Sequence, residues 1–147
     1  MVNFNNIPAV ILAGCKGTRI SEYSKNIPKP MVKIKGTPII DYIIRFYKKF
    51  GVKKFYILTG YKSKIIENHF KKKNNINVIY SGQNSMTGGR LLFLKNKIEG
   101  NFFCTYGDGI SNIKLNRLYN LHLKKKKIAT LTAVHPISRF GEVIFKK

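Results

Sequence analysis

A short apolar run near the start of the chain leads into a glycine-containing loop that also carries a hydroxyl and an arginine. The run is Pro8 to Ala13, and the loop reads Leu12-Ala13-Gly14-Cys15-Lys16-Gly17-Thr18-Arg19. A strand that ends in such a loop places backbone N–H groups and a guanidinium at the carboxyl edge of a sheet, which suits phosphates. The loop is neither a Walker loop nor the three-glycine dinucleotide fingerprint. Its spacing alone is equally compatible with phosphate binding and with a plain tight turn.

A lysine between two prolines follows ten residues after Arg19, in Pro28-Lys29-Pro30-Met31. The two prolines hold this segment extended and fix the direction of the Lys29 side chain. A stiffened lysine near a phosphate loop supplies a point charge for a triphosphate. Taken by itself, however, the segment is better explained as a surface lysine in a rigid connector.

Three later groups of residues make the pattern more specific. They are Met86-Thr87-Gly88-Gly89-Arg90, then Phe103 to Gly109 with the sequence FCTYGDG, then Ala129 to Val134 followed by Arg139-Phe140-Gly141. Together with the first loop and Lys-Pro-Met, they resemble the sugar-phosphate nucleotidyltransferase family, and within it the glucose-1-phosphate cytidylyltransferases. The resemblance runs from about Ala9 to Gly141.

The resemblance implies a reaction between CTP and α-D-glucose 1-phosphate that gives CDP-glucose and pyrophosphate, for surface-polysaccharide synthesis. A sugar-phosphate oxygen would attack the α-phosphorus of CTP in line with the departing pyrophosphate. The resemblance also implies Mg²⁺ as cofactor, a Rossmann-like nucleotide-diphospho-sugar transferase fold, and a homo-oligomer. Such transfer depends on positioning and charge neutralisation rather than on a protein nucleophile.

The family pattern assigns a role to each matching residue. It makes Arg19 and Lys29 the catalytic cations that offset charge on the pyrophosphate, and Asp108 the first Mg²⁺ ligand, which agrees with the preference of Mg²⁺ for carboxylates and phosphates. The nucleotide-binding positions that it implies are Leu12, Ala13, Gly14, Cys15, Lys16, Gly17, Thr18, Arg19, Lys29, Ser85, Arg90 and Gly107.

The chain departs from the family pattern at three points. Cys15 stands where the family usually has glycine, and Ser85 replaces a threonine while keeping the hydroxyl. The family takes its second metal-binding aspartate from far beyond Lys147, whereas this sequence contains only Asp41 and Asp108. Two alternatives therefore stay open: a related sugar-1-phosphate nucleotidyltransferase with another base or sugar, and a truncated, inactive remnant that binds nucleotide.

The net charge of +22 raises a third hypothesis, nucleic-acid binding, because lysine and arginine neutralise phosphates. Of the 28 basic residues, 23 are lysine, and asparagine and isoleucine are also abundant, which is typical of AT-rich codon usage. The aromatic residues form no repeated basic–aromatic array of the kind that single-stranded nucleic acid prefers. We therefore interpret the lysines as a solvated surface that steers acidic small molecules toward the protein.

Strand-like and helix-like stretches alternate along the chain. The pattern predicts strands at 8–13, 55–59, 77–80, 102–106 and 128–134, and helices at 39–49, 63–70, 90–98 and 115–123. This alternation predicts an α/β fold, a mostly parallel sheet with helices on both faces, in which residues 1–147 form one nucleotide-binding domain. Residues 143–147 resemble the beginning of another strand, so we expect either that the domain closes there with an edge strand or that the fold is C-terminally incomplete.

Length and composition indicate what class of protein this is. A chain of 147 residues with 44% apolar side chains buries a real core. The apolar run at 9–13 is too short to span a bilayer, and no secretory signal is evident. Two cysteines are too few for a disulfide scaffold and fit a reducing compartment. We therefore predict a cytoplasmic protein with no membrane partner.

Overall fold

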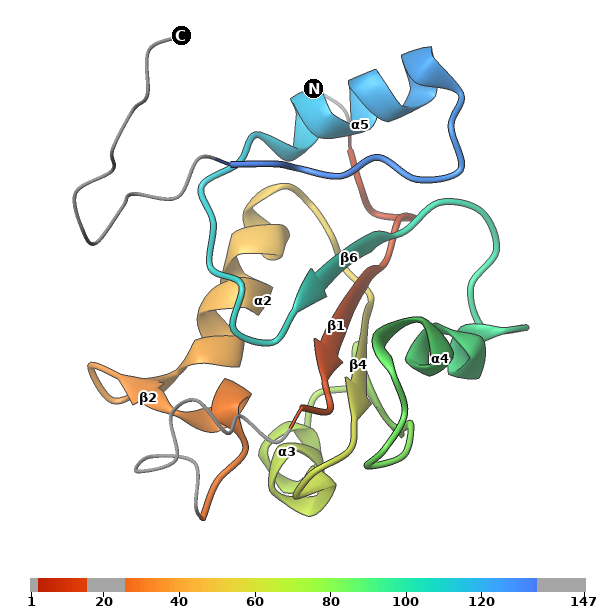
Figure 1. Cartoon of the computed structure of the whole chain (residues 1–147). Helices are drawn as coiled ribbons and strands as arrows, with labels where there is room; N and C mark the ends of the chain where they lie inside the picture. The colour runs from red at the N-terminus through yellow and green to blue at the C-terminus, as the bar shows by residue number, and fades with distance from the viewer. Residues whose placement is uncertain (1–2, 16–25, 135–147) are drawn as a thin grey trace, which may run out of the picture. The chain divides into compact units, whose positions relative to one another are not determined.

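Four parallel strands form the centre of the computed structural model, which describes residues 3–15 and 26–134 (Figure 1). The strand order is β5-β4-β1-β6. Their bounds are Ala9–Ala13 for β1, Phe55–Thr59 for β4, Ile76–Tyr80 for β5 and Phe103–Tyr106 for β6. The predicted strands at 8–13, 55–59, 77–80 and 102–106 are thus present, and the predicted parallel α/β architecture is confirmed.

The two central strands are apolar on both faces because helices cover both sides of the sheet. Every residue of β1 and of β4 is buried, which is typical of strands inside a parallel sheet. Ala9 pairs with Phe55 on one side and with Phe103 on the other. This register alternates the side chains, so that those of Val10 and Leu12 face one helical layer while those of Ala9 and Ile11 face the other.

Helices α2 and α4 lie on opposite sides of the sheet (Figure 1). On one side, α2 (Ile39–Lys49) packs Tyr47 against Phe103, with ring centroids 5.8 Å apart. On the other side, α4 (Thr87–Leu91) leads into a short 3-10 helix, η3 (Leu92–Leu94). Leucines of α4 and η3 join the apolar cluster of Val10, Leu12, Tyr56, Leu58 and Leu94, together with Ile79, Leu91 and Ile98.

The strand order places a topological switch point between β1 and β6. From β1 the chain crosses to β4 through α2, and then to β5 through α3 (Ser63–Phe70). It then returns through α4 to β6, on the far side of β1. In open α/β sheets, ligands bind in the crevice at the carboxyl ends of two such strands. A 3-10 helix, η2 (Lys29–Met31), and a hairpin of β2 (Lys33–Ile34) and β3 (Thr37–Pro38) fill the connection before α2.

An acidic residue cross-links the two helices on the α2 side of the sheet. The carboxylate of Asp41, on α2, accepts a 2.8 Å hydrogen bond from Nε2 of His69, on α3, and lies 3.6 Å from Nζ of Lys73. The sequence pattern explains Asp41 by the dipole of its own helix, and the structure adds this contact between helices. Asp41 is therefore engaged within the helical layer.

One predicted helix differs in its bounds. The sequence predicts a helix at 90–98, whereas α4 begins at Thr87, includes Gly88 and Gly89, and gives way to η3 after Leu91. A tight 3-10 turn brings residues three apart onto the same side, so Leu91 and Leu94 reach the sheet without a longer helix. Lys95 is extended and ends the element.

The chain divides into two compact units, Met1–Asn112 and Ile113–Lys147, so the single domain over 1–147 stays a prediction. In the second unit, α5 (Leu115–Lys125) confirms the predicted helix and extends it by two residues. The predicted strand at 128–134 is wrong, because this segment forms no strand. Ile128, Leu131 and Val134 are exposed there, so the apolar residues of this segment have no packed face behind them.

Within residues 3–15 and 26–134, no helix has the length and apolar character needed to cross a membrane. Cys15 and Cys104 are both free thiols on the surface.

We predict that Tyr47 makes folding sensitive to alkaline pH. Burial raises the pKa of Tyr47 to about 12, while a side-chain hydrogen bond with Thr105 acts in the opposite direction. Below the unfolded pKa of about 10 the phenol is neutral in both states, and its contribution to stability is fully present. Between about pH 10 and 12 the unfolded state alone ionises, so up to roughly 3 kcal/mol of stability is lost.

The measurement is the unfolding free energy from urea titrations of wild type and Tyr47→Phe between pH 8 and 11.5. The unfolding free energy of wild type minus that of Tyr47→Phe should fall as pH rises, because only the tyrosine ionises in the unfolded state. Lysine titration affects both proteins and cancels in this difference. A difference that stays constant with pH would show that the buried phenol does not carry the effect.

Candidate active site

The carboxyl ends of β1 and β6 meet at the switch point. The backbone N–H of Gly107, the first residue after β6, donates a 2.9 Å hydrogen bond to the carbonyl of Leu12. Gly107 is buried and has no space for a side chain, because a Cβ there would lie 2.6 Å from Cγ of Pro30. Leu12, Ala13, Gly14 and Gly107 are thus brought together, as the sequence predicts for a nucleotide site.

The packing of Pro30 on Gly107 also places Lys29 beside Asp108. Pro30 and Met31 are buried in η2, and Lys29 precedes them with its side chain 29% exposed. Nζ of Lys29 forms an ion pair with the carboxylate of Asp108, whose side chain is 35% exposed. Two residues that lie 79 positions apart in the sequence therefore meet at the predicted reaction centre.

The Lys29–Asp108 pair is accessible enough to be exchanged. Partly exposed ion pairs contribute about 1 kcal/mol or less, because water already solvates both charges well. An incoming phosphate competes for the ammonium, and a cation competes for the carboxylate. The pair thus presents one positive and one negative group to a ligand at the switch point.

Asp108 is a carboxylate of the kind that Mg²⁺ takes as a ligand in phosphate-processing sites. Mg²⁺ in phosphate-processing sites takes one or two carboxylates and completes its octahedron with phosphates and water. Asp108 supplies one such carboxylate at the end of a parallel strand. Among the described residues, no cluster of three or more His, Cys, Asp or Glu side chains offers a complete metal site. Asp41, the second aspartate of the sequence, is bonded to His69 and Lys73 instead.

The guanidinium of Arg90 is buried beneath this edge of the sheet and is bonded to three strand ends. Nη1 donates to the carbonyl of Thr59 at 3.1 Å, to Oγ of Ser81 at 2.8 Å and to the carbonyl of Gly82 at 2.7 Å. Nη2 donates to the carbonyl of Gly14 at 3.3 Å. Arg90 is only 4% exposed. The sequence assigns Arg90 to the nucleotide, and the structure gives its guanidinium protein partners.

Glycines surround the guanidinium closely. A Cβ on Gly14 would overlap the guanidinium itself, and a Cβ on Gly60 would lie 3.0 Å from Nη1 of Arg90 and 2.8 Å from the carbonyl of Gly14. Gly82 has φ of +89°, which side chains rarely adopt. Sequence reasoning missed Thr59, Gly60, Ser81 and Gly82. The signal in the sequence that could have indicated them is a glycine within two residues after each strand.

Of the remaining predicted nucleotide-binding residues, the structure describes only Ser85 and Cys15. Ser85 is half-buried in the loop between β5 and α4, where it donates a 2.5 Å hydrogen bond to the carbonyl of Ser81. Cys15 is exposed, directly after Gly14. The other predicted members of the first loop lie outside the described residues, and they are Lys16, Gly17, Thr18 and Arg19.

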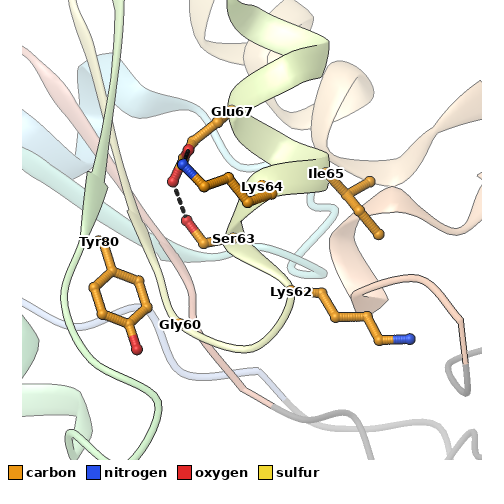
Figure 2. A pocket seen from close by; sticks show the side chains of 7 residues that line it. All are labelled: Gly60, Lys62, Ser63, Lys64, Ile65, Glu67 and Tyr80. Carbon is orange, nitrogen blue, oxygen red and sulfur yellow. Dashed lines mark hydrogen bonds and ion pairs between the residues drawn. The ribbon is translucent and has the colours of Figure 1, made fainter.

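A surface pocket of about 550 Å³ lies one strand away from the switch point (Figure 2). Its lining residues are Gly60, Lys62, Ser63, Lys64, Ile65, Glu67 and Tyr80. Ser63 donates a 2.5 Å hydrogen bond to Glu67, and this bond lowers the pKa of the carboxyl, with Lys64 as a further cause. None of the residues that the sequence assigns to nucleotide or metal lines this pocket.

The chain belongs to the nucleotidyl transferase family, whose model matches residues 8–147. This agrees with the resemblance that the motifs carry and with the parallel sheet of the fold.

Individual relatives differ in the substrates that their names state. The chain is 37% identical to a probable glucose-1-phosphate cytidylyltransferase of Bacillus subtilis, over 90% of this chain and 62% of that protein. It is 31% identical to a D-glycero-α-D-manno-heptose 1-phosphate guanylyltransferase of Campylobacter jejuni, over 92% and 62% of the two chains. The crystal structure of HddC from Yersinia pseudotuberculosis complexed with GMP-PN superposes with a TM-score of 0.69 and 29% identity, over 80% and 54%. The chain thus spans about 62% of the length of each of the two enzymes from Bacillus and Campylobacter.

We predict that Gly14→Ala destabilises the protein by about 2 to 4 kcal/mol, because the new methyl overlaps the Arg90 guanidinium and displaces it from its acceptors. Gly88→Ala is the matched control, since a Cβ there meets no atom within 4 Å and Gly88 lies inside α4. The control should be neutral or stabilising by up to about 1 kcal/mol. Thermal and urea unfolding of both variants test this, and equal stabilities would contradict the packing described for Gly14.

Proposed function

We propose that the protein is a sugar-phosphate nucleotidyltransferase that transfers the cytidylyl group of CTP to α-D-glucose 1-phosphate. The products are CDP-glucose and pyrophosphate. One observation carries the proposal: Lys29 and Asp108 meet at the β1/β6 switch point, beside the hydrogen bond that joins Gly107 to Leu12. Family membership and the similarity to a probable glucose-1-phosphate cytidylyltransferase support it.

Each residue has a role in the proposed transfer. The sugar-phosphate oxygen forms a bond to the α-phosphorus of CTP, and the bond from that phosphorus to the bridging oxygen of pyrophosphate breaks. Lys29, released from Asp108, neutralises negative charge that builds on the leaving pyrophosphate. Asp108 would hold Mg²⁺, which would supply positive charge to offset the negative charge of the phosphates. The Gly14 loop with Arg19 would cradle the phosphates.

The proposal also specifies the nucleotide base and the sugar phosphate that the enzyme uses. Relatives of similar identity are named for cytidylyl and for guanylyl transfer. CTP is favoured because the motifs of this chain resemble the cytidylyltransferases, Ser85 and Arg90 included. Turnover rates with CTP, dTTP, UTP and GTP, each with glucose 1-phosphate, separate these alternatives.

We predict that the full chain releases pyrophosphate from CTP and glucose 1-phosphate with Mg²⁺, and that Asp108→Asn reduces the rate at least 100-fold. Loss of the carboxylate removes a metal ligand, and single electrostatic groups of this kind contribute about 10²–10³ in rate. Glu99→Gln is the control, since Glu99 is an exposed acid outside the site. A coupled phosphate assay measures the release.

The outcomes of this assay separate three cases. Release that needs both substrates and is lost only in Asp108→Asn supports the enzyme. CTP binding by calorimetry without release points to a nucleotide-binding remnant. If the protein binds none of the four nucleotides, the proposal is contradicted.

We also predict that Lys29→Met lowers kcat by about 100-fold with a smaller effect on the KM for CTP. The ammonium interacts most strongly with charge that develops in the transition state, so its loss affects the chemical step more than binding. Lys33→Met, at an exposed lysine four residues later, should leave both constants unchanged. Steady-state kinetics of the two variants measure this, and equal effects of both substitutions would argue against a specific role for Lys29.

A further inference from the structure

The structure gathers seven exposed lysines at one end of the parallel sheet. They lie on two segments: residues 48–54 lead from the end of α2 to β4, and residues 71–75 join α3 to β5. The seven are Lys48, Lys49, Lys53, Lys54, Lys71, Lys72 and Lys73, and together they form the lysine surface. We infer that the lysine surface binds the phosphate backbone of double-stranded nucleic acid, and that it does so without reading the base sequence.

Hydrogen bonds hold the two segments side by side. The backbone N–H of Phe55 donates to the carbonyl of Asn75 at 3.0 Å, and Nδ2 of Asn75 donates to the carbonyl of Lys53 at 2.9 Å. Residues of both segments also line a shared hollow of about 340 Å³, and they are Lys48, Gly51, Val52, Lys53 and Asn75. The lysines of the two segments therefore belong to one surface.

Little negative charge opposes these lysines. Neither segment contains an acidic residue. Lys73 lies 3.6 Å from the carboxylate of Asp41, whose side chain is only 14% exposed. The dipole of α2 favours cations in the last turn of that helix, yet Lys53 and Lys54 lie beyond it. Codon usage sets how many lysines the chain has, which is 23, whereas the fold places seven of them together.

The side chains on this surface suit phosphates rather than bases. Lysine ammonium groups neutralise backbone phosphates and release their counterions, and the exposed amides of Asn74 and Asn75 add neutral polar groups of the kind that contact phosphate and sugar. Neither segment contains arginine, the side chain that most often reads guanine in the major groove. Neither exposes a large aromatic ring on which an unpaired base could stack. These features favour a duplex that is bound independently of its sequence.

An anionic lipid surface is a poorer partner. Stable attachment to a membrane takes a second signal besides a basic patch, such as a lipid chain or apolar side chains that enter the interface. None of the large apolar side chains that are exposed in residues 3–15 and 26–134 lies in either segment. The lysine surface thus offers charge without an apolar anchor, which is what a duplex requires and a membrane does not retain.

The lysine surface and the candidate active site lie at opposite ends of the sheet. The lysines precede the first residues of β4 and β5, whereas Gly14 and Gly107 follow the last residues of β1 and β6. Figure 1 shows that α2 ends and β4 begins at the end of the sheet that lies away from β2. Five strand residues separate the two ends by roughly 15 Å. The inference therefore does not rest on the proposed function, and a bound duplex would leave the nucleotide site open.

The experiment removes three lysines of the surface together, as Lys48→Gln, Lys53→Gln and Lys72→Gln. This variant keeps Lys54, which lies over the Tyr56 ring, and Lys73, which pairs with Asp41. Fluorescence anisotropy measures the affinity of the full chain for labelled duplexes of DNA and of RNA, each about 20 base pairs long and in two unrelated sequences, from about 50 to 200 mM salt.

The matched control removes the same charge elsewhere. Lys124, Lys125 and Lys127 belong to a second run of exposed lysines, at the end of α5 and just after it, and the control changes these three to glutamine. Vesicles of phosphatidylserine and phosphatidylcholine, sedimented with the protein at the same salt concentrations, test the lipid alternative. Thermal unfolding confirms that both variants are folded.

For wild type we expect a dissociation constant of about 1 to 100 μM at about 150 mM salt, equal for the two sequences. The Lys48/Lys53/Lys72 variant should bind at least tenfold more weakly, and the slope of log K against log salt should become shallower by about 2 to 3, because each lost phosphate contact contributes about 0.9. The control variant should bind within twofold of wild type.

Four results would overturn the inference. They are equal losses in the two variants, which would assign the binding to net charge alone; a strong preference for one duplex sequence; binding to the vesicles without binding to any duplex; and no binding of wild type to a duplex at about 150 mM salt.

A second measurement locates the contact on wild type itself. Acetylation of lysines by an activated ester, followed by mass spectrometry, reports which ammonium groups a duplex covers. We expect the duplex to slow acetylation at least threefold across the lysine surface and to leave 124–127 unchanged. Protection confined to 124–127 or to Lys29 would contradict the assignment. Pyrophosphate release by the Lys48/Lys53/Lys72 variant tests the proposed function separately, since these lysines lie away from its site.

Discussion

The site depends on one buried cation that holds three strand ends together. Parallel strands that end side by side leave their last carbonyls at one edge, where buried backbone oxygens need donors. Arg90 supplies these donors to Gly14, Thr59 and Gly82 from a short helix on one face of the sheet. Glycines accompany the guanidinium because a Cβ at Gly14 or Gly60 would collide with it. The ends of these three strands are therefore held relative to one another.

Two kinds of charge contact serve different purposes at this edge. Arg90 is buried, has several acceptors and is costly to rearrange, so it suits a fixed scaffold. The Lys29–Asp108 pair is partly exposed, and ligands are able to exchange it at small cost. Pro30 packs on Gly107, next to Leu12 of the central strand, and so places Lys29 beside Asp108. In the proposed function, this pair would separate when Lys29 binds phosphate and Asp108 binds a cation.

Local patterns predicted the central fold well because buried strands and amphipathic helices have clear periods. The bounds of β4, α2 and α3 follow from such patterns, and the motifs bring Lys29 and Asp108 to one site. The segment at 128–134 shows the limit, since apolar and β-branched residues without a partner strand do not make a strand. The set of hydrogen bonds that Arg90 donates was also beyond sequence reasoning. Its acceptors are mostly backbone carbonyls from three distant segments, and only the folded chain brings them together.

The most direct test of this account is the location of nucleotide binding, measured by backbone amide shifts in an NMR titration of the full chain with CTP and Mg²⁺. The account predicts shifts at Gly14, Ser85, Gly107 and Asp108, around the β1/β6 switch point. Residues 62–67, which line the neighbouring pocket, should change little. Shifts concentrated at 62–67, with none at Gly107 or Asp108, would contradict it.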